Sequence, residues 1–355
     1  MSIPPGSTIG IIGGGQLGRM LAIAAARLGY KSHIFDPHES PCATHVAAAH
    51  TRAAFDDVDA LDRFGVQVDV VTYEFENVPV EPLKVLAGKL CPGARSLAIA
   101  QDRAREKEFI EQCGARVATW REVSSLADVE EAVAELGLPL VLKTRRYGYD
   151  GKGQAWVHSA DEAAQAWAAI GEHPAVAESA IAFESEFSVI VARWKDGRHA
   201  FWDSAENEHG EGILRRSTVP CGDAVAAQVP QAREAALSIA DALGHVGVLT
   251  VEFFAGADGP IVNEIAPRVH NSGHWTIEGS VTSQFEQHIR AICDLPPGLT
   301  GLVRGGAVMD NLIGADIERW PELVAERGAH VHIYGKGEAR PGRKMGHVTR
   351  VTRRG

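Results

Sequence analysis

The sequence predicts an α/β fold, in the broad sense that includes α+β, with a doubly wound parallel-sheet domain first and a small β-rich domain last. The length of 355 residues suits two or three domains rather than one. Short apolar strands alternate with a helix near the beginning, which is typical of βαβ units. The stretch 184–220 alternates like antiparallel strands, and the last segment is rich in Gly and basic residues. We therefore expect three domains, at 1–98, 99–296 and 297–355.

The first domain opens with a glycine-rich turn between two strands. An apolar strand at 7–12 leads into Gly-Gly-Gly-Gln-Leu-Gly at 13–18, and an Ala/Leu-rich helix follows. Gly-x-Gly-x-x-Gly in a βαβ unit, with Asp36 ending the next strand, is typical of a nicotinamide-dinucleotide site. Free N–H groups at a helix N-terminus would hold a ribonucleotide phosphate equally well. Another buried strand, at 68–73, ends in the polar residues Glu74, Glu76 and Asn77.

The composition excludes several classes of protein. The net charge of −11 argues against a general nucleic-acid-binding surface. The five cysteines are scattered and form no Cys-x-x-Cys, which predicts a reducing cytoplasm and no zinc site. The first residues lack the basic and apolar regions of a signal peptide, and no apolar run approaches the ~18 residues of a membrane span. We expect a cytoplasmic protein that binds neither nucleic acid nor membrane.

A second glycine-rich loop lies at 148–153, after a buried strand at 138–143 that ends in Lys143. Three glycines in six residues let the backbone amides bend around an anion, and the lysine adds a point charge. Lys107, in a charged helix at 101–113, would supply another. The loop lacks the P-loop spacing, and taken alone it also fits a tight hairpin with solvated lysines. The elements expected around it are helices at 125–136 and 159–170 and a strand at 154–157.

Two carboxylates, Glu252 and Glu264, are expected to face each other across a β-hairpin. The segment Gly-Ala-Asp-Gly at 256–259 reads as its turn, and folding about it brings the two glutamates to neighbouring positions. Carboxylates side by side repel unless a cation lies between them, and hard oxygen ligands suit Mg²⁺ that carries substrate phosphates. A long helix at 223–243 precedes this hairpin, and another helix is expected at 278–292.

Seven strings of residues, taken together and in this order, resemble the 5-(carboxyamino)imidazole ribonucleotide synthetases, a family of the ATP-grasp superfamily. They are Gly-Gly-Gly-Gln-Leu-Gly-Arg-Met at 13–20, Thr-Tyr-Glu-Phe-Glu-Asn at 72–77, Gly-Tyr-Asp-Gly-Lys-Gly-Gln at 148–154, Asn-x-His-x-x-Gly-Ile-Leu from 207, Asn-Glu-Ile-Ala-Pro-Arg-Val-His-Asn-Ser-Gly-His-Trp-Thr at 263–276, Thr-Ser-Gln-Phe-Glu at 282–286 and Arg-Pro-Gly-Arg-Lys-Met-Gly-His at 340–347. The resemblance covers nearly the whole chain. The strings at 263–276 and 340–347 are the most specific.

The resemblance implies an ATP-grasp fold, with a small lid subdomain at about 115–180 in the middle domain, and an enzyme of purine biosynthesis. ATP would phosphorylate bicarbonate to carboxyphosphate, and the exocyclic amine of aminoimidazole ribonucleotide would take up the carboxyl group through CO₂ released in the closed site. The family uses ATP with one or two Mg²⁺ ions and suggests a homodimer. Water has to be excluded, because carboxyphosphate hydrolyses readily, and the loops at 148–153 and 207–212 are the candidates for a closing lid.

The resemblance also implies a role for each polar residue in these strings. The catalytic group would be Arg268, His270, Tyr149, Asp150 and Lys336, with Arg268 gripping bicarbonate and His270 carrying a proton. ATP would contact Lys107, Lys143, Gly148, Gly151, Lys152, Gly153, Gln154, Glu178, Glu186 and His209, with Glu178 at the adenine amino group and Glu186 at the ribose. The ribonucleotide would contact Gly15, Gln16, Leu17, Glu76, Asn77, Asn271, Ser272, Lys336 and Arg343. Mg²⁺ would bind Glu252, Glu264 and Asn263.

Three other functions remain open from the residues. One is another ATP-grasp ligase, such as the formate-using glycinamide ribonucleotide transformylase or biotin carboxylase. The second is a nicotinamide-dependent oxidoreductase, which rests on the turn at 13–18 and on Asp36. The third is an ATP-binding protein without activity, although no expected polar position is missing. Arg215 and Arg216, which the resemblance does not explain, are expected to face solvent.

Overall fold

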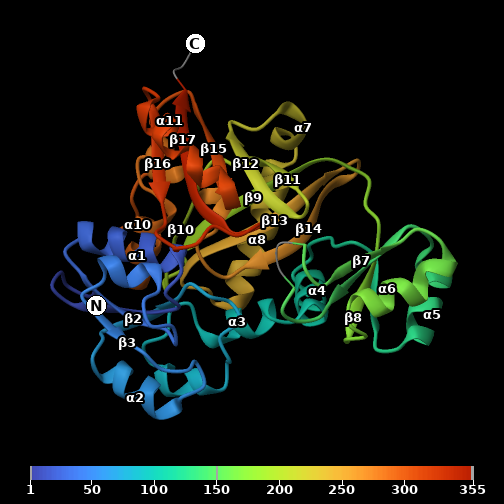
Figure 1. The fold of residues 1–355 in the computed structure, drawn as a ribbon, viewed down its shortest axis with the longest axis horizontal. Coiled ribbons are helices and arrows are strands. Elements are labelled where there is room, and N and C mark those ends of the chain that lie inside the picture. The colour runs from blue at the N-terminus through green and yellow to red at the C-terminus, as the bar shows by residue number, and fades with distance from the viewer. Residues whose placement is uncertain (1, 149–150, 353–355) are drawn as a thin grey trace.

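Three β-sheets divide the molecule, and the largest of them runs through two of the predicted domains (Figure 1). The structure is a computed structural model, and it describes residues 2–148 and 151–352. The predicted catalytic residues Tyr149 and Asp150 therefore lie outside the described residues. Within the described ranges, no helix combines the length and the apolar character needed to cross a membrane.

The N-terminal sheet is parallel, with the strand order β3 (Ala49–Thr51), β2 (Lys31–Phe35), β1 (Thr8–Ile12) and β4 (Val70–Tyr73). Side chains alternate along β1, so Ile9 and Ile11 pack with helix α1 (Gln16–Arg27), while Ile12 packs on the other side with α2 (Val58–Val66). Helices on both faces of a parallel sheet define a doubly wound domain, and this prediction is confirmed.

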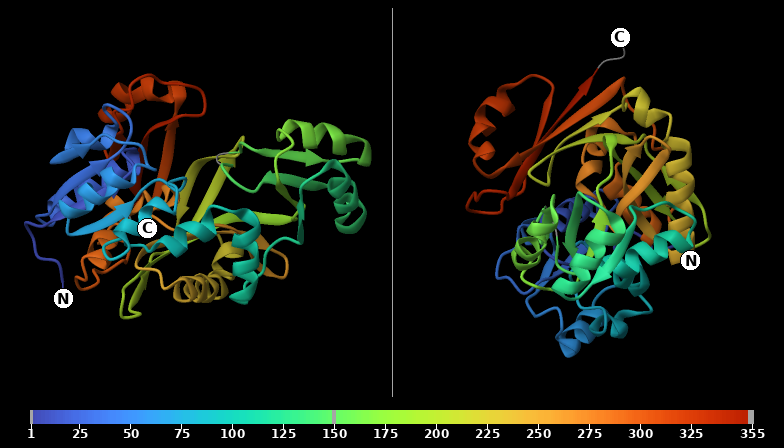
Figure 2. Two further views of the ribbon diagram at one scale, coloured as in Figure 1. Left: turned by 90° about the horizontal axis from the view of Figure 1, so that it is seen from below. Right: turned by 90° about the vertical axis from the view of Figure 1, so that its right-hand side faces the viewer.

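The second sheet forms a small lobe that projects from one side of the molecule (Figure 2). Its antiparallel strands have the order β5 (Trp120–Val123), β8 (Ala175–Ser179), β6 (Leu140–Thr144) and β7 (Gln154–Val157). Helices α5 (Leu126–Leu136) and α6 (Ala163–Ala169) bury their apolar side chains against it. Helices α3 (Ala94–Ala100) and α4 (Arg103–Gln112) connect the lobe to the N-terminal domain. Asp102 caps α4, because its carboxylate accepts the backbone N–H groups of Ala104 and Arg105.

The third sheet has nine strands. Eight of them lie in the order β14 (Gly259–Ala266), β13 (Gly247–Gly256), β9 (Phe183–Arg193), β11 (Ala205–Gly210), β12 (Ile213–Val219), β15 (Gly306–Ile313), β17 (Lys344–Thr352) and β16 (Ala329–Ile333), and β10 (His199–Phe201) pairs with β9. The C-terminal region is β-rich as predicted, with η5 (Gly314–Arg319) and α11 (Trp320–Ala325) beside its strands. Its strand β15 pairs directly with β12, so the two regions share one sheet.

Two helices predicted as single elements are each divided in two. The segment at 223–243 forms α7 (Asp223–Ala226) and α8 (Val229–Leu243), because Pro230 favours the first turn of a new helix and restricts the residue before it. The segment at 278–292 forms α9 (Thr276–Gly279) and α10 (Gln284–Ile292). The Ser283 hydroxyl accepts the Glu286 N–H and starts α10 anew.

Candidate active site

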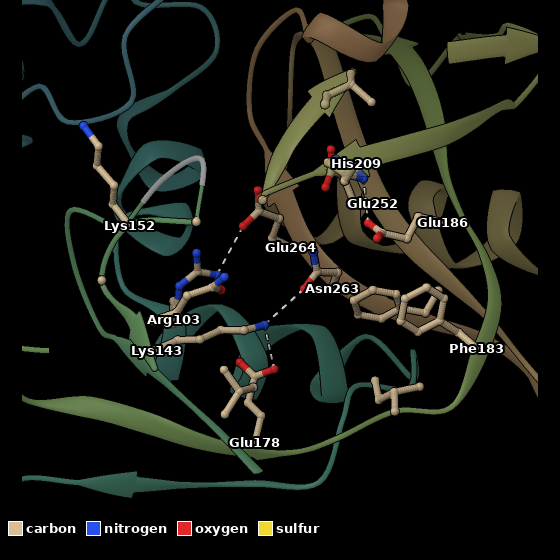
Figure 3. A pocket seen from close by; sticks show the side chains of 18 of the residues that line it. Arg103, Lys143, Lys152, Glu178, Phe183, Glu186, His209, Glu252, Asn263 and Glu264 are labelled. Atoms are coloured by element: carbon tan, nitrogen blue, oxygen red, sulfur yellow. Dashed lines mark hydrogen bonds and ion pairs between the residues drawn. The ribbon is translucent and has the colours of Figure 1, made fainter. Parts of the chain in front are cut away.

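A cleft of about 330 Å³ lies between the small lobe and the edge of the central sheet (Figure 3). Strands β6, β7 and β8 form one wall, and β12, β13 and β14 contribute to the other. The mouth is apolar, with the rings of Phe183 and Phe254 4.6 Å apart. The inner end is polar and holds the groups described next. Together the residues suit a ligand with one flat apolar part and one charged part.

The inner end contains the predicted pair of carboxylates. Glu252 lies directly opposite Glu264 in the β13–β14 ladder, so the predicted hairpin and register are confirmed. Burial, together with the charge of Glu264, raises the pKa of Glu252 to about 7. A cation between the two carboxylates would relieve this repulsion. Across the described ranges, no three or more His, Cys, Asp or Glu residues are arranged to hold a metal alone. The two facing carboxylates supply hard oxygen donors, which suit a Mg²⁺ ion that shares its ligands with phosphates.

A buried carboxylate joins the two lysines predicted to bind phosphate. Glu178 Oε1 lies 3.1 Å from Lys107 Nζ, and Glu178 Oε2 lies 3.0 Å from Lys143 Nζ. Burial alone would raise the pKa of Glu178, but Lys143 and Lys107 hold it at about 2. Figure 3 shows Lys143 extending between Glu178 and Asn263, whose Oδ1 atom is 3.3 Å from Nζ. Lys143 thus lines the cleft, whereas Lys107 lies behind Glu178 with 1% of its side chain exposed.

Arg103 is a residue of the cleft that the sequence did not reveal. Its Nη1 atom lies 3.2 Å from Glu264 Oε2, and Figure 3 shows the two side chains pointing toward each other. A second unpredicted cation, Lys344 at the start of β17, also lines the cleft. The only signal for Arg103 was its position at the start of the charged helix that also carries Lys107.

The second glycine-rich loop contacts the other predicted lid segment. Gly151 and Gly153 have left-handed backbones, with φ of +77° and +72°. A Cβ on Gly151 would lie 3.1 Å from the carbonyl oxygen of Glu211, and a Cβ on Gly153 would overlap with Thr144 Oγ1. The two segments therefore pack against each other at the rim of the cleft. His209 and Glu186 lie nearby, with Nδ1 and Oε2 2.9 Å apart. The predicted nucleotide contacts that line the cleft are Lys143, Gly151, Lys152, Gly153, Gln154, Glu178, Glu186 and His209.

The loop after β14 connects the cleft with the N-terminal domain. Arg268 Nε lies 3.0 Å from Glu76 Oε1, and two residues later His270 Nε2 lies 3.4 Å from Glu252 Oε1. Burial and the charge of Arg268 hold the pKa of His270 well below its usual value. Its role as a proton carrier was predicted from an unperturbed pKa near neutrality; burial beside Arg268 shifts that pKa, and the role itself stays a prediction.

Two residues predicted to contact the ribonucleotide make buried contacts within the protein. Ser272 is fully buried, and its Oγ atom lies 2.9 Å from Nδ1 of His270. Asn271 exchanges two amide hydrogen bonds with Asn311 of β15, at 2.9 and 2.8 Å. Both residues therefore hold the loop that carries His270, although Asn271 also borders the cleft.

The first glycine-rich turn is filled by carboxylates of the protein. Gly14 donates its N–H to Asp36 Oδ2 and Gly15 donates its N–H to Glu74 Oε1, both at 2.7 Å. These are N–H groups that the pyrophosphate of a dinucleotide would use. Asp36 also accepts the backbone N–H of His38 at 2.8 Å, so it is not available for a ribose. This geometry contradicts the nicotinamide-dependent alternative.

Several other residues discussed from the sequence do not line the cleft. Lys336 Nζ lies 5.7 Å from the centre of the Tyr334 ring, and burial lowers its pKa. Arg343 donates to the Glu338 carbonyl oxygen at 3.0 Å. Asn77 borders a separate hollow of about 370 Å³ next to Arg105. Leu17 is buried in the core of the first domain, so only its backbone is available to a ligand. Arg215 and Arg216 border another hollow, away from the cleft.

Three known domain families match successive parts of the chain. The ATP-grasp domain family matches residues 108–285, the ribonucleotide synthetase preATP-grasp domain family matches 6–101, and the phosphoribosylaminoimidazole carboxylase C-terminal domain family matches 307–354. The chain is similar to the N5-carboxyaminoimidazole ribonucleotide synthase of Brucella melitensis, with 51% identity over 99% of this chain and 98% of that one. The Bacillus subtilis synthase is 44% identical over 98% of this chain and 92% of its own length.

Solved structures that resemble this chain belong to the same family of synthases. The crystal structure of the ADP complex of an N5-carboxyaminoimidazole ribonucleotide synthetase matches 99% of this chain and 94% of its own, with a TM-score of 0.94 and 43% identity. A synthase from Aspergillus clavatus, in complex with ADP and 5-aminoimidazole ribonucleotide, matches with a TM-score of 0.91 and 32% identity. The latter match covers 98% of this chain and 94% of that one.

Proposed function

The chain belongs to the N5-carboxyaminoimidazole ribonucleotide synthases, a family of the ATP-grasp superfamily, and we propose that its cleft uses ATP to activate bicarbonate as carboxyphosphate. The overall activity is the ATP-dependent conversion of 5-aminoimidazole ribonucleotide to N5-carboxyaminoimidazole ribonucleotide in purine biosynthesis. The observation that carries the proposal is the short loop at 268–270. Arg268 contacts the N-terminal domain through Glu76, while His270 contacts Glu252 in the cleft. In this proposal, the loop joins the ribonucleotide site to the site of the ATP phosphates.

ATP enters the cleft with its base at the apolar mouth, against the packed rings of Phe183 and Phe254. Its phosphates reach the inner end, where Lys143 and Arg103 supply positive charge. The other contacts are those predicted from the resemblance: Lys107, Gly148, Gly151, Lys152, Gly153, Gln154, Glu178, Glu186 and His209. Lys107 acts from behind Glu178 by holding that carboxylate in place. The loops at 148–153 and 207–212 cover the phosphates and exclude water.

Mg²⁺ would be held by Glu252, Glu264 and the Asn263 side chain, in one or two sites shared with the phosphates. When bound, the ion neutralises charge on the phosphates and on the γ-phosphoryl group as it transfers. The opposed carboxylates support this assignment, because they repel each other without a cation.

In the first step, a bicarbonate oxygen attacks the γ-phosphorus, the bond to the bridging oxygen breaks, and ADP leaves with that oxygen. Arg268 holds the planar bicarbonate through its guanidinium group. In the second step, the C–O bond of carboxyphosphate breaks to give CO₂ and phosphate. The exocyclic amine forms a bond to the CO₂ carbon, and the departing phosphate takes the proton that the amine loses. His270 donates a hydrogen bond from Nε2 to oxygens on which charge develops.

The ribonucleotide binds between the first glycine-rich turn and the loop that carries Arg268. The residues predicted to contact it from the resemblance are Gly15, Gln16, Leu17, Glu76, Asn77, Asn271, Ser272, Lys336 and Arg343, with Tyr149 and Asp150 from the lid loop. Ser272 acts through His270, because its side chain is fully buried.

The five cysteines are unpaired, which supports a reducing, cytoplasmic environment. We further propose a homodimer, for which a solution mass of twice 38.0 kDa is the test.

Phosphate release from Mg-ATP tests the proposal, measured with and without bicarbonate and with and without 5-aminoimidazole ribonucleotide. Release that requires the ribonucleotide and rises with bicarbonate supports the two-step route. Labelled bicarbonate should also deliver one ¹⁸O atom to the released phosphate, because the attacking oxygen stays on phosphorus. Release without the label would contradict carboxyphosphate while leaving the overall activity in place.

A further inference from the structure

A chain of hydrogen bonds crosses the central sheet and ends on the ring of His270. The Ser217 hydroxyl donates to Asn207 Oδ1 at 2.8 Å, and Asn207 Nδ2 donates to Ser188 Oγ at 3.2 Å. Ser188 Oγ donates to Ser272 Oγ at 2.7 Å, and Ser272 Oγ lies 2.9 Å from His270 Nδ1. These residues come from β12, β11, β9 and the loop after β14, and Asn207 lies opposite Ser217 in the β11–β12 ladder. We call this set the serine–asparagine relay.

The chemistry of the relay gives it one direction. An amide NH₂ group only donates, so Ser188 accepts from Asn207 and passes its own proton to Ser272. Ser272 then has its hydroxyl proton left for Nδ1 of His270. The backbone N–H of Ser272 also donates to Nδ1, at 3.3 Å, and a backbone N–H can act only as a donor. Two donors on Nδ1 leave the ring proton on Nε2, which faces Glu252 across 3.4 Å.

The relay is isolated from solvent and from the cleft. Ser217 and Ser272 are 0% exposed, Ser188 is 1% exposed and Asn207 is 5% exposed. None of the four lines the cleft, so they have no direct contact with a ligand there. Burying a polar group costs free energy of folding unless the group is hydrogen-bonded. Each of the four side chains in the relay is hydrogen-bonded. Water cannot replace a missing member, so the loss of one hydroxyl changes the next bond in the chain.

We propose that Ser188 and Asn207 are positioning residues for the carboxylation, which act through Ser272 to hold the His270 ring and to keep its proton on Nε2. The proposal rests on the role of His270 in the proposed function. The phosphate-bearing end of the cleft thereby always meets a hydrogen-bond donor rather than a lone pair. A ring with the opposite tautomer would present an acceptor to Glu252 and to the anionic substrates, and would repel both.

The test combines a tautomer measurement with kinetics on Ser188→Ala, which removes the link between Asn207 and Ser272. In ¹⁵N-histidine-labelled wild type, we expect His270 Nδ1 to show the shift of an unprotonated nitrogen and Nε2 that of a protonated one. His270→Gln identifies these signals by their loss. Ser188→Ala removes the bond that holds Ser272 Oγ in place, so the Ser272 hydroxyl can turn away from Nδ1. The two shifts should then move toward each other, and kcat should fall about 10- to 100-fold with an unchanged KM for ATP. Asn207→Asp is the second variant, because it replaces a donor by an acceptor of the same shape.

Ser96→Ala is the matched control. The Ser96 hydroxyl lies 3.0 Å from Nδ1 of His245, another fully buried histidine whose Nε2 contacts the Val248 carbonyl oxygen at 3.0 Å. This variant removes the same kind of bond away from the cleft, so it should lower the melting temperature similarly and leave kcat intact. Unchanged His270 shifts and kcat in both relay variants would overturn the proposal. The shifts are read on the ligand-free protein, so they decide the relay even if the phosphate-release assay contradicts the proposed function.

Discussion

Gln284 holds the backbone of His270 with both ends of its side-chain amide. Its Oε1 atom accepts the His270 N–H at 2.9 Å, and its Nε2 atom donates to the His270 carbonyl oxygen at 2.6 Å. Gln284 is fully buried at the start of α10. The peptide on each side of His270 is thereby fixed to a helix, while the relay fixes its ring.

Gln284→Glu should lower kcat by about 10- to 100-fold, because a carboxylate oxygen would replace the Nε2 donor and face the His270 carbonyl oxygen. Gln287→Glu is the control, since Gln287 makes the same pair of bonds to Gly298, each at 2.9 Å, in the same helix. Steady-state kinetics and thermal melts of both variants provide the measurement. We expect both variants to lose a similar amount of thermal stability. Only Gln284→Glu should also lose activity. Equal activity in the two variants would contradict a role for Gln284 at the site.

Gly153→Ala should weaken ATP binding. The residue has a left-handed backbone, and its new Cβ would overlap with Thr144 Oγ1, so the loop has to move away from the cleft. Strain of about 1–3 kcal/mol is expected, which corresponds to roughly a tenfold or larger rise in the KM for ATP. Gly197→Ala is the control, because Gly197 has φ of +88° in the turn before β10 with nothing within 4 Å of its Cβ. Calorimetric ATP affinities that fall equally in both would show that general destabilisation is responsible.

Glu264→Gln and Glu252→Gln should each raise the Mg²⁺ concentration needed for half-maximal activity, since each removes one of two facing carboxylates. We expect a shift of about tenfold or more, which corresponds to about 1.4 kcal/mol of binding free energy. The measurement is the initial rate as a function of free Mg²⁺ at saturating ATP. Glu208→Gln, on an exposed position of β11, is the control. The same Mg²⁺ dependence in all three variants would remove the metal assignment.

Glu106→Gln should stabilise the ligand-free protein at alkaline pH. Burial raises the pKa of Glu106 from 4.5 to about 8, although the Arg103 charge opposes this. The folded state therefore holds a proton that the unfolded chain has lost, and stability falls as the pH rises from about 4.5 toward 8. The Ile265 N–H donates to Glu106 Oε1 at 2.7 Å, and a glutamine side chain keeps an acceptor for it. Unlike glutamate, glutamine does not ionise.

Melting temperatures between pH 4.5 and 9 test this expectation. The variant and the wild type should melt alike at pH 4.5, and the variant should gain several degrees by pH 8.5. Glu108→Gln, at an exposed position of the same helix, should give a difference that does not change with pH. A constant difference for Glu106→Gln would mean that the carboxyl group ionises normally in the folded state.

Local patterns were sufficient for the parts of the site that lie close together in sequence. The turn at 256–259 determined that Glu252 lies opposite Glu264, because a hairpin register follows from its turn. Glycine spacing likewise predicted both loops. The sequence did not reveal that the first turn is already filled, because Glu74 reaches Gly15 across 59 positions. Its carboxylate looked like a ligand contact and is instead the partner of a backbone N–H.

Contacts between distant segments carried no local signal. Arg103 lies in a helix with charged residues all along it, so nothing in that pattern indicated which charge faces the cleft. Ser272 was expected at the substrate because the resemblance implied it, two residues after His270. Its true partners, Ser188 on β9 and the Nδ1 atom of His270, depend on the packing of the loop over the sheet.

The direct pairing of β12 with β15 limits where this protein can be cut or extended. The ladder joins residues as far apart in sequence as Ser217 and Met309. Truncation before β15 would leave β12 as an open edge with unpaired backbone groups, which invites aggregation or exchange of strands between copies. The predicted boundary at 296/297 is therefore a poor site for truncation or for inserting a reporter domain. The turn around Gly197, which is clear of neighbouring atoms, is a better place to insert one.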